Sequence, residues 1–346
     1  MASRSGPDHT GQILTNVRRQ IAVDDDVLLE TKERRNLVKR MARKFEGALK
    51  TFDSGSVAHG TVNKPVSDAD CGVVLDRRHH PELGPDGDGV APDTIVREVA
   101  EFVIGGVREE YPAAICEVSK RAIVISFNEP LDRDQDPSVD LIVALTRAEG
   151  DGRWIPNTEQ HDWDASDPEK HTELLNGPTG SARIHRARVI RLAKAATKQD
   201  DRPVVSSFNT EALALGHVDE EDTIAESLRD LFHGAADDLA SRDTPDPAGV
   251  SDPIKLPEGV SREEAVDRLR GFGDSISEAI DNAEDEDRAR SVLRRVFPDY
   301  VETEPSAKAS LAEAVAAGDS AKVGAAFGAG AASLKRTSAY GDGTAK

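Results

Sequence analysis

Three aspartates stand in a pattern that suits metal-assisted chemistry at phosphorus. Asp68-Ala69-Asp70 enters a strand-like segment, with Asp70 as the first residue of the run DCGVVL, and Asp140 is the one charge inside the run SVDLIVAL. Because side chains alternate across a strand, Asp68 and Asp70 present two carboxylates to one face, which is costly unless cations are bound there. If the strand that holds Asp140 lies beside this one, three hard oxygen ligands converge. Such ligands suit Mg²⁺ or Mn²⁺ rather than zinc.

A triad of this kind predicts two cations per active site, roughly 3.5–4 Å apart, as used for in-line displacement at phosphorus. Asp140 would also accept the proton of the attacking hydroxyl. Upstream, the Gly55-Ser56 turn lets backbone N–H groups approach phosphate oxygens, and the Ser56 hydroxyl adds a donor. The turn does not begin a P-loop, because Thr61 stands where that motif requires Lys.

These residues also resemble a known family. The run GSVAHGT, followed by DAD and later by Asp140, resembles the signature of the polymerase-β nucleotidyltransferase superfamily. The segment WIPNTEQHDWDASDPEKH at 154–171 and TPDPAG at 244–249 are similar to segments of the bacterial relatives of cyclic GMP-AMP synthase and oligoadenylate synthase, the CD-NTase family. The resemblance covers roughly residues 10–300 at superfamily level.

The resemblance implies roles for three further residues. The run RVIRLAKA resembles the spine-helix lysine motif of these enzymes, which implies that Lys194 binds the nucleotide phosphates. Ser207-Phe208 resembles their Ser-Tyr motif, which implies that the Ser207 hydroxyl binds phosphate and that the Phe208 ring stacks on a base. Ser206 competes for the hydroxyl role. His59 lies inside the phosphate loop and is interpreted as incidental, since phosphoryl transfer does not need it.

The remaining patterns predict the elements that must position these side chains. Strands are expected at Asp70–Leu75, Arg121–Phe127 and Ser138–Leu145, with a helix over Asp93–Glu110. The order strand, helix, strand, strand predicts a mixed sheet with helices packed against it. From Arg183 onward the periodicity is almost entirely helical. We therefore predict an α+β fold, a polymerase-β-like nucleotidyltransferase mixed sheet with a helical second lobe.

Three regions are expected. Residues 1–180 would hold N-terminal helices and the catalytic core, 181–305 the helical lobe, and 306–346 a C-terminal helix with a flexible Ala- and Gly-rich tail. The two tryptophans, Trp154 and Trp163, are expected between the sheet and the helical part. A long helix is expected after the acidic cluster 24–26, with its charged residues on a solvated face and its apolar face through Leu28, Leu37, Met41, Phe45 and Leu49.

Composition limits the partners. Lysine and arginine number 44 against 64 acidic residues, a formal charge of −20, which repels phosphate backbones and disfavours a stable nucleic-acid partner. An anionic substrate must then be held by metal ions or a few placed cations. No run reaches the length of a membrane span. Only Cys71 and Cys116 are present, so no disulfide framework is expected, and a cytoplasmic location follows.

These observations predict a metal-dependent nucleotidyltransferase acting on ribonucleoside triphosphates. The resemblance implies cyclic di- or oligonucleotide second messengers as products, a role in bacterial antiphage signalling, and a downstream effector that binds the product. An alternative keeps the active site and changes the acceptor: a template-independent enzyme that acts on RNA 3′ ends or makes linear oligoadenylates. A catalytically idle nucleotide-binding module is a third interpretation, disfavoured by the three intact aspartates.

Overall fold

The computed structural model describes residues 6–302, apart from 132–134, 178–179 and 200–202. The chain divides into two compact units, Met1–Tyr300 and Val301–Lys346, and all helices and strands of the described residues lie in the first. The expected C-terminal helix and tail at 306–346 lie outside the described residues. Within the described range, no helix combines the length and the apolar character needed to cross a membrane.

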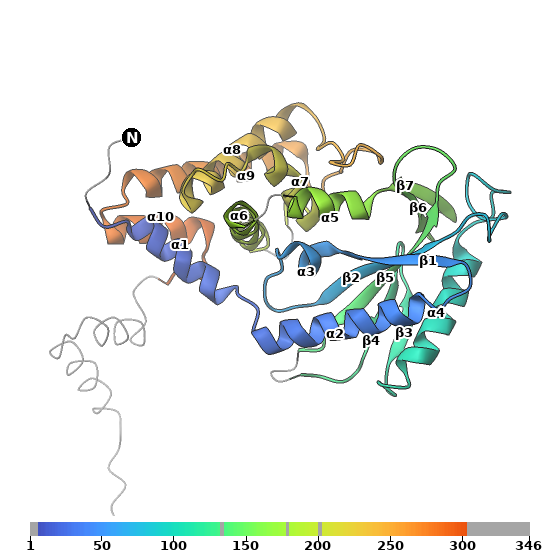
Figure 1. Cartoon of the computed structure of the whole chain (residues 1–346). Coiled ribbons are helices and arrows are strands. Elements are labelled where there is room, and N and C mark those ends of the chain that lie inside the picture. The colour runs from blue at the N-terminus through green and yellow to red at the C-terminus, as the bar shows by residue number, and fades with distance from the viewer. Residues whose placement is uncertain (1–5, 132–134, 178–179, 200–202, 303–346) are drawn as a thin grey trace, which may run out of the picture. The chain divides into compact units, whose positions relative to one another are not determined.

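The first unit contains a mixed sheet (Figure 1), which has seven strands in the described part of the chain. Five of them follow the order β1-β2-β5-β4-β3. Strand β6 pairs with the last residues of β5, and β7 pairs with β6. The central pair β2–β5 is parallel and the other pairs are antiparallel. The strands are β1 Ala48–Ser54, β2 Asp68–Leu75, β3 Ile115–Val118, β4 Ile123–Ser126, β5 Ser138–Thr146, β6 Arg153–Asn157 and β7 Asp162–Ser166.

The alternation of side chains along β2 and β5 decides what each face of the sheet carries. Cys71 and Val73 of β2, with Leu141 and Val143 of β5, point into a large core under α2 (Asp25–Ala42) and α4 (Asp93–Val107). The opposite face carries a smaller apolar cluster around Phe52. Asp68, Asp70 and Asp140 belong to this second face, because each is an even number of residues from a member of that cluster.

The charged side of α2 is not simply solvated, contrary to expectation. Arg34 is fully buried. Its guanidinium donates to Glu30 Oε1 at 2.9 Å, to Asp136 Oδ1 at 2.5 Å and to the carbonyl of Pro137, and it lies 4.7 Å from the centre of the Phe127 ring. Arg34 therefore anchors the segment that leads into β5, immediately before Asp140.

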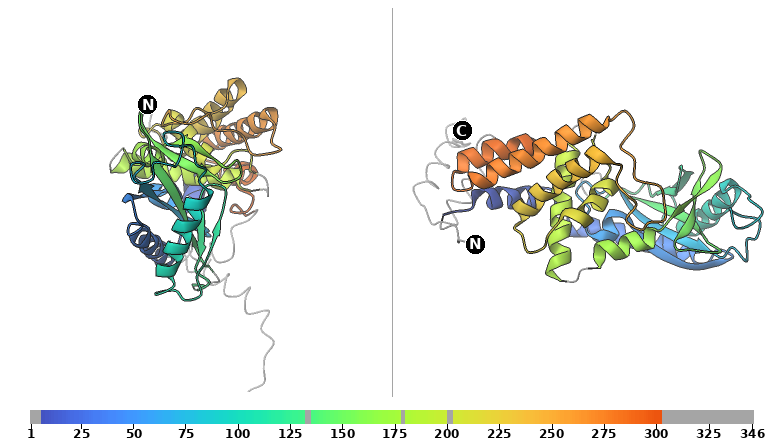
Figure 2. Two further views of the ribbon diagram at one scale, coloured as in Figure 1. Left: turned by 90° about the vertical axis from the view of Figure 1, so that its right-hand side faces the viewer. Right: turned by 90° about the horizontal axis from the view of Figure 1, so that it is seen from above.

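Helices build the rest of the unit beside the sheet (Figure 2). Helix α1 (His9–Gln20) packs against α6, α8 and α10. Its Thr10 hydroxyl donates to the carbonyl of Ala279 at 2.6 Å. The helices that follow the sheet are α5 Pro168–Asn176, α6 Ser181–Thr197, α7 Ser207–His217, α8 Ile224–Ser241, α9 Arg262–Asp281 and α10 Glu286–Val296.

Several expectations about elements need correction. The long second helix ends at Ala42, residues 43–47 form turns, and the supposed continuation to Leu49 lies in strand β1. Trp163 belongs to the core that the sheet shares with α2 and α4 and donates to the carbonyl of Val90, so it does not lie between the sheet and the helices that follow it in the chain. Trp154 packs against the same core. Strands β3, β6 and β7 and helices α5 and α7 were not expected.

Candidate active site

The structure brings the three aspartates to one place on the sheet. Asp70 of β2 is paired directly with Asp140 of β5, and Asp68 is paired with Ser138. All three therefore lie on the same face within two residues of one another along adjacent strands. As predicted, the strands that carry the aspartates are neighbours, and their parallel register places Asp70 opposite Asp140.

Electrostatics make this cluster unfavourable on its own. Burial, followed by repulsion from Asp68 and Asp140, raises the pKa of Asp70 to about 7. Burial and then the charge of Asp68 raise the pKa of Asp140 to about 6. Among the described residues, no three His, Cys, Asp or Glu side chains are placed so that they could hold a metal ion as they stand. By donor type the three side chains fit divalent metal ions, because carboxylate oxygens are the ligands that Mg²⁺ and Mn²⁺ prefer and a cation would offset the repulsion between them.

The turn after β1 lies against this cluster. Gly55 has φ +68°, and a Cβ built on it would lie 1.7 Å from Oδ2 of Asp70. A side chain at this position would strain the left-handed backbone and displace the Asp70 carboxylate, which explains the glycine. The turn opens the short helix α3 (Gly55–His59), and Gly55, Ser56, Asp68 and Asp70 line one cavity of about 700 Å³. The sequence predicted this meeting of turn and acid pair.

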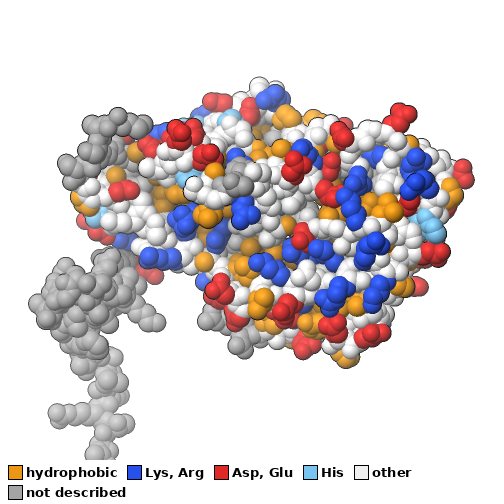
Figure 3. All heavy atoms as spheres, viewed as in Figure 1, with side chains coloured by type: hydrophobic (Ala, Val, Ile, Leu, Met, Phe, Trp, Pro, Cys, Tyr) orange, Lys and Arg blue, Asp and Glu red, His pale blue; other side chains and the backbone are white. Residues whose placement is uncertain are grey.

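Cations also line this cavity, which is notable for a chain of net charge −20. Lys64, Lys194 and Lys198 contribute to its wall. Figure 3 shows Lys and Arg side chains among the acidic ones over α2 and β1 as well, so the negative charge is not spread evenly over this face. The expectation that an anionic substrate would meet locally placed cations is consistent with this distribution.

Lys194 is buried and already paired. Its ammonium donates to Glu211 Oε1 at 2.5 Å and to the Thr61 hydroxyl at 3.1 Å. Glu211 also accepts a hydrogen bond from the Thr61 hydroxyl. Burial alone would raise the pKa of Glu211, but His59 and Lys194 together lower it to about 2. Lys194 thus reaches the cavity wall as part of an ion pair, and the sequence analysis missed its partner Glu211.

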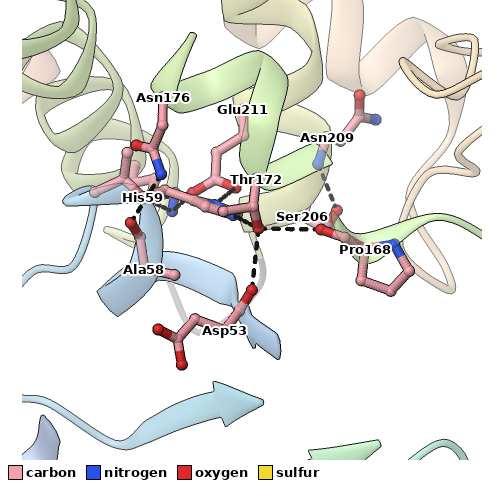
Figure 4. Close-up of polar contacts among 11 residues, drawn as sticks. Asp53, Ala58, His59, Pro168, Thr172, Asn176, Ser206, Asn209 and Glu211 are labelled. Carbon is pink, nitrogen blue, oxygen red and sulfur yellow. Dashed lines mark hydrogen bonds and ion pairs between the residues drawn. The ribbon is translucent and has the colours of Figure 1, made fainter. Parts of the chain in front are cut away.

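His59 belongs to the same network (Figure 4). Its Nδ1 lies 3.0 Å from Glu211 Oε2, and its Nε2 lies 3.0 Å from the Thr172 hydroxyl of α5. The interpretation of His59 as an incidental loop residue is wrong, since it is buried and joins α3, α5 and α7. One signal was available: Glu211 is a lone acid before the apolar run ALAL, the same kind of signal that singled out Asp140.

At the start of α7 the two serines have different surroundings. The Ser206 hydroxyl caps the helix by accepting from the backbone N–H of Asn209 at 3.0 Å. Ser207 lines the cavity, as does Phe208, whose side chain is 36% exposed. Ring contact ties Phe208 to His171, with centroids 4.8 Å apart. Ser206 is therefore engaged by the helix cap, and Ser207 is the serine that borders the open space.

A second cavity of about 780 Å³ adjoins the first. The two share Ser54, His171 and Phe208 in their walls. The second cavity lies over β6, β7 and the loop before α9, and its polar lining residues include Arg121, Asn157, Asp164, Asp252 and Lys255. The site thus offers two neighbouring spaces separated by one shared wall.

Comparison with known proteins agrees with this geometry. A scan against family models finds no match, and a search of curated proteins finds none either. Solved structures do match. E. coli MS115-1 CdnC with ATP has a TM-score of 0.59 at 19% identity, covering 85% of this chain and 99% of that one. The Bradyrhizobium diazoefficiens CD-NTase CdnG in complex with GTP has a TM-score of 0.61 at 13% identity, covering 84% and 96%.

The chain has the CD-NTase fold. A third match, the Vibrio cholerae cyclic AMP-GMP synthase DncV in complex with a linear intermediate, has a TM-score of 0.53 at 13% identity and covers 85% of this chain and 87% of that one. At identities of 13–19%, the similarity establishes a shared fold. The CD-NTase fold confirms the predicted α+β class and the polymerase-β-like fold that the sequence resemblance implied.

Proposed function

We propose that this chain is a metal-dependent nucleotidyltransferase that joins ribonucleoside triphosphates into cyclic di- or oligonucleotides. One observation carries the proposal: Asp70 and Asp140 are paired on adjacent parallel strands, with Asp68 two residues away, beside the Gly55-Ser56 turn. The CD-NTase fold supports it, because the matched structures include a cyclic AMP-GMP synthase and complexes with ATP and GTP.

Asp68, Asp70 and Asp140 would hold the Mg²⁺ or Mn²⁺ ions, two per site. When bound, such ions neutralise the triphosphate and the departing pyrophosphate and make the attacking ribose hydroxyl more acidic. The protein's own part is to hold the carboxylates on one face of β2 and β5. Asp140, the one farthest along the chain, would accept the hydroxyl proton as the new phosphodiester bond forms.

Two substrate nucleotides need two spaces, and the two adjoining cavities supply them. The first contains the turn and the acid pair, so we assign it to the triphosphate of the nucleotide under attack. Ser56 and Ser207 would donate hydroxyl hydrogen bonds to phosphate oxygens, and Phe208 would stack on a base. Lys194 would contribute its positive charge while remaining attached to Glu211. The second cavity would hold the nucleotide that supplies the hydroxyl.

The proposed product is a second messenger. By its resemblance to the bacterial relatives of cyclic GMP-AMP synthase, the chain would act in antiphage signalling in the cytoplasm, through an effector that binds the cyclic nucleotide. No stable nucleic-acid partner is part of this proposal.

The test is direct. The purified chain would be incubated with labelled ATP, GTP, CTP and UTP and with Mg²⁺ but no RNA, and the products identified by phosphatase treatment and mass spectrometry. Phosphatase-resistant cyclic products are expected. Label that appears only on added RNA, or only in linear oligoadenylate, would favour the alternative acceptors.

The matched control is the Asp68→Asn, Asp70→Asn double variant, which keeps side-chain volume and removes the two charges. We expect it to remain folded by circular dichroism and to make no product. Full activity in the double variant would contradict the metal-site assignment.

A further inference from the structure

His171 occupies an unusual position at the boundary between the two cavities. It lies on α5, its side chain is largely buried, and it lines both cavities. Of the three residues that the cavities share, it is the only one with an ionisable side chain. His171 has no role in the proposed metal binding by the three aspartates or in phosphate binding by the Gly55-Ser56 turn, so its position in the shared wall needs a separate explanation.

A buried carboxylate fixes the orientation of the His171 ring. Nε2 of His171 lies 2.6 Å from Oδ1 of Asp246, whose side chain is only 1% exposed. Oδ2 of Asp246 accepts the backbone N–H groups of Val250 and Ser251, each at 2.9 Å. Burial would raise the pKa of Asp246, but these two N–H groups and then the imidazole lower it. Asp246 is therefore an ionised acceptor, and the shared hydrogen belongs to Nε2.

The His171–Asp246 pair connects a loop that lines the second cavity to a ring that borders both cavities. Asp246 closes the loop whose residues 250–255 line the second cavity. The His171 ring contacts Phe208, with 4.8 Å between centroids, and Phe208 borders the first cavity as well as the second.

We propose that His171, oriented by Asp246, is a positioning residue that holds Phe208 and the 246–255 loop in the places required for nucleotide binding at the shared wall. This inference rests on the proposed function of the site. A flat ring held against Phe208 limits the orientations of that aromatic side chain, and a pre-ordered stacking surface lowers the entropy cost of binding a base. Loss of the ring should weaken nucleotide binding while leaving the reacting groups in place.

Three variants separate these contributions. His171→Ala removes ring and hydrogen bond together. His171→Gln retains an N–H that can reach Asp246 but loses the flat contact with Phe208. Asp246→Asn keeps its shape and removes the charge that orients the imidazole. His217→Ala is the matched control, because His217 forms a similar pair with Asp238 at 2.8 Å and lines neither cavity.

The measurements are KM and kcat for the nucleoside triphosphate and, independently, binding of a non-hydrolysable ATP analogue by calorimetry. We expect His171→Ala to raise KM and the Kd of the analogue about tenfold, the size expected for one base–aromatic contact, with kcat changed less than about threefold. Asp246→Asn should show a smaller rise of the same kind, and His217→Ala no rise. A purely structural role would instead lower the melting temperature and the active fraction, leaving KM unchanged.

The two proposals fail in different ways. If the wild-type chain makes no nucleotide product but binds the analogue, the proposed function fails and the calorimetric comparison still decides the role of His171. An unchanged Kd in His171→Ala overturns the inference in every case. Absence of analogue binding by the wild-type chain overturns both proposals.

Discussion

Replacing Asp70 by Asn should stabilise the metal-free protein at alkaline pH. Burial and the charges of Asp68 and Asp140 raise the pKa of Asp70 from the ordinary 3.8 to about 7. The folded state therefore binds this proton more tightly than the unfolded state does. Stability contributed by the protonated carboxyl is fully present below pH 4 and is lost as the pH rises to about 7.

The size of the effect follows from the same shift. A rise in pKa from 3.8 to about 7 corresponds to about 4 kcal/mol at pH 8, taking about 1.4 kcal/mol for each pH unit. Asn carries no charge and escapes this penalty. Because neighbouring groups relax, we expect the metal-free Asp70→Asn variant to be about 2–4 kcal/mol more stable than the wild type at pH 8, with little difference at pH 4.

The assay is urea denaturation at both pH values, with a chelator and again with millimolar Mg²⁺. Mg²⁺ should stabilise the wild type at pH 8 by binding the folded state, and should stabilise the variant far less. Asp88→Asn, an exposed change in the loop before α4, serves as the control and should leave stability unchanged under all four conditions. Two results would refute the reasoning: a metal-free variant less stable than the wild type at pH 8, or equal stabilisation of both proteins by Mg²⁺.

Three further changes test other contacts. Arg34→Met should cost about 3 kcal/mol of unfolding free energy in urea, because it leaves partly buried carboxylates without their cation; a cost below about 1 kcal/mol would contradict this. Lys194→Met should cost about 3 kcal/mol by leaving the buried Glu211 without its ammonium partner, although His59 and Thr61 still contact it. Adding Glu211→Gln should restore most of the stability but not the affinity for triphosphate in calorimetry; recovered affinity would argue against a phosphate role. Gly55→Ala should reduce the reaction rate at least about 100-fold, because the added methyl displaces the Asp70 carboxylate and a small misplacement of a reacting group costs about that much. Gly60→Ala is the control, since Gly60 has a similar φ but nothing within 4 Å of its Cβ, and it should lose far less activity in the same rate assay. Equal losses in the two variants would mean that backbone strain alone is responsible.

Much of the candidate site could be read from local pattern. The spacing of Asp68 and Asp70 puts both side chains on one face of any strand, whatever surrounds it. Asp140 stands out because a charge inside an apolar strand requires a partner. The Gly-Ser turn is likewise a property of adjacent residues. For these reasons the acidic triad and the mixed sheet could be predicted from the sequence.

Other features depend on contacts between distant segments. Glu211, His59 and Lys194 come from three separate helices, and only their packing brings an acid, an imidazole and an ammonium together in a buried place. Arg34 looked like a solvated helix residue because nothing in its own neighbourhood reveals the ring and carbonyls that enclose it. The strand Ala48–Ser54 was hidden because its alternation is brief and follows directly on a helical pattern.

The sequence by itself determined which side chains could do chemistry and which of them share a strand face, since covalent geometry and the two-residue period operate locally. The tertiary structure alone decided that β2 and β5 are parallel neighbours with Asp70 opposite Asp140, and that Lys194 reaches the cavity wall paired with Glu211. Register and burial depend on how the whole sheet and its helices pack, and no short stretch of chain contains that information.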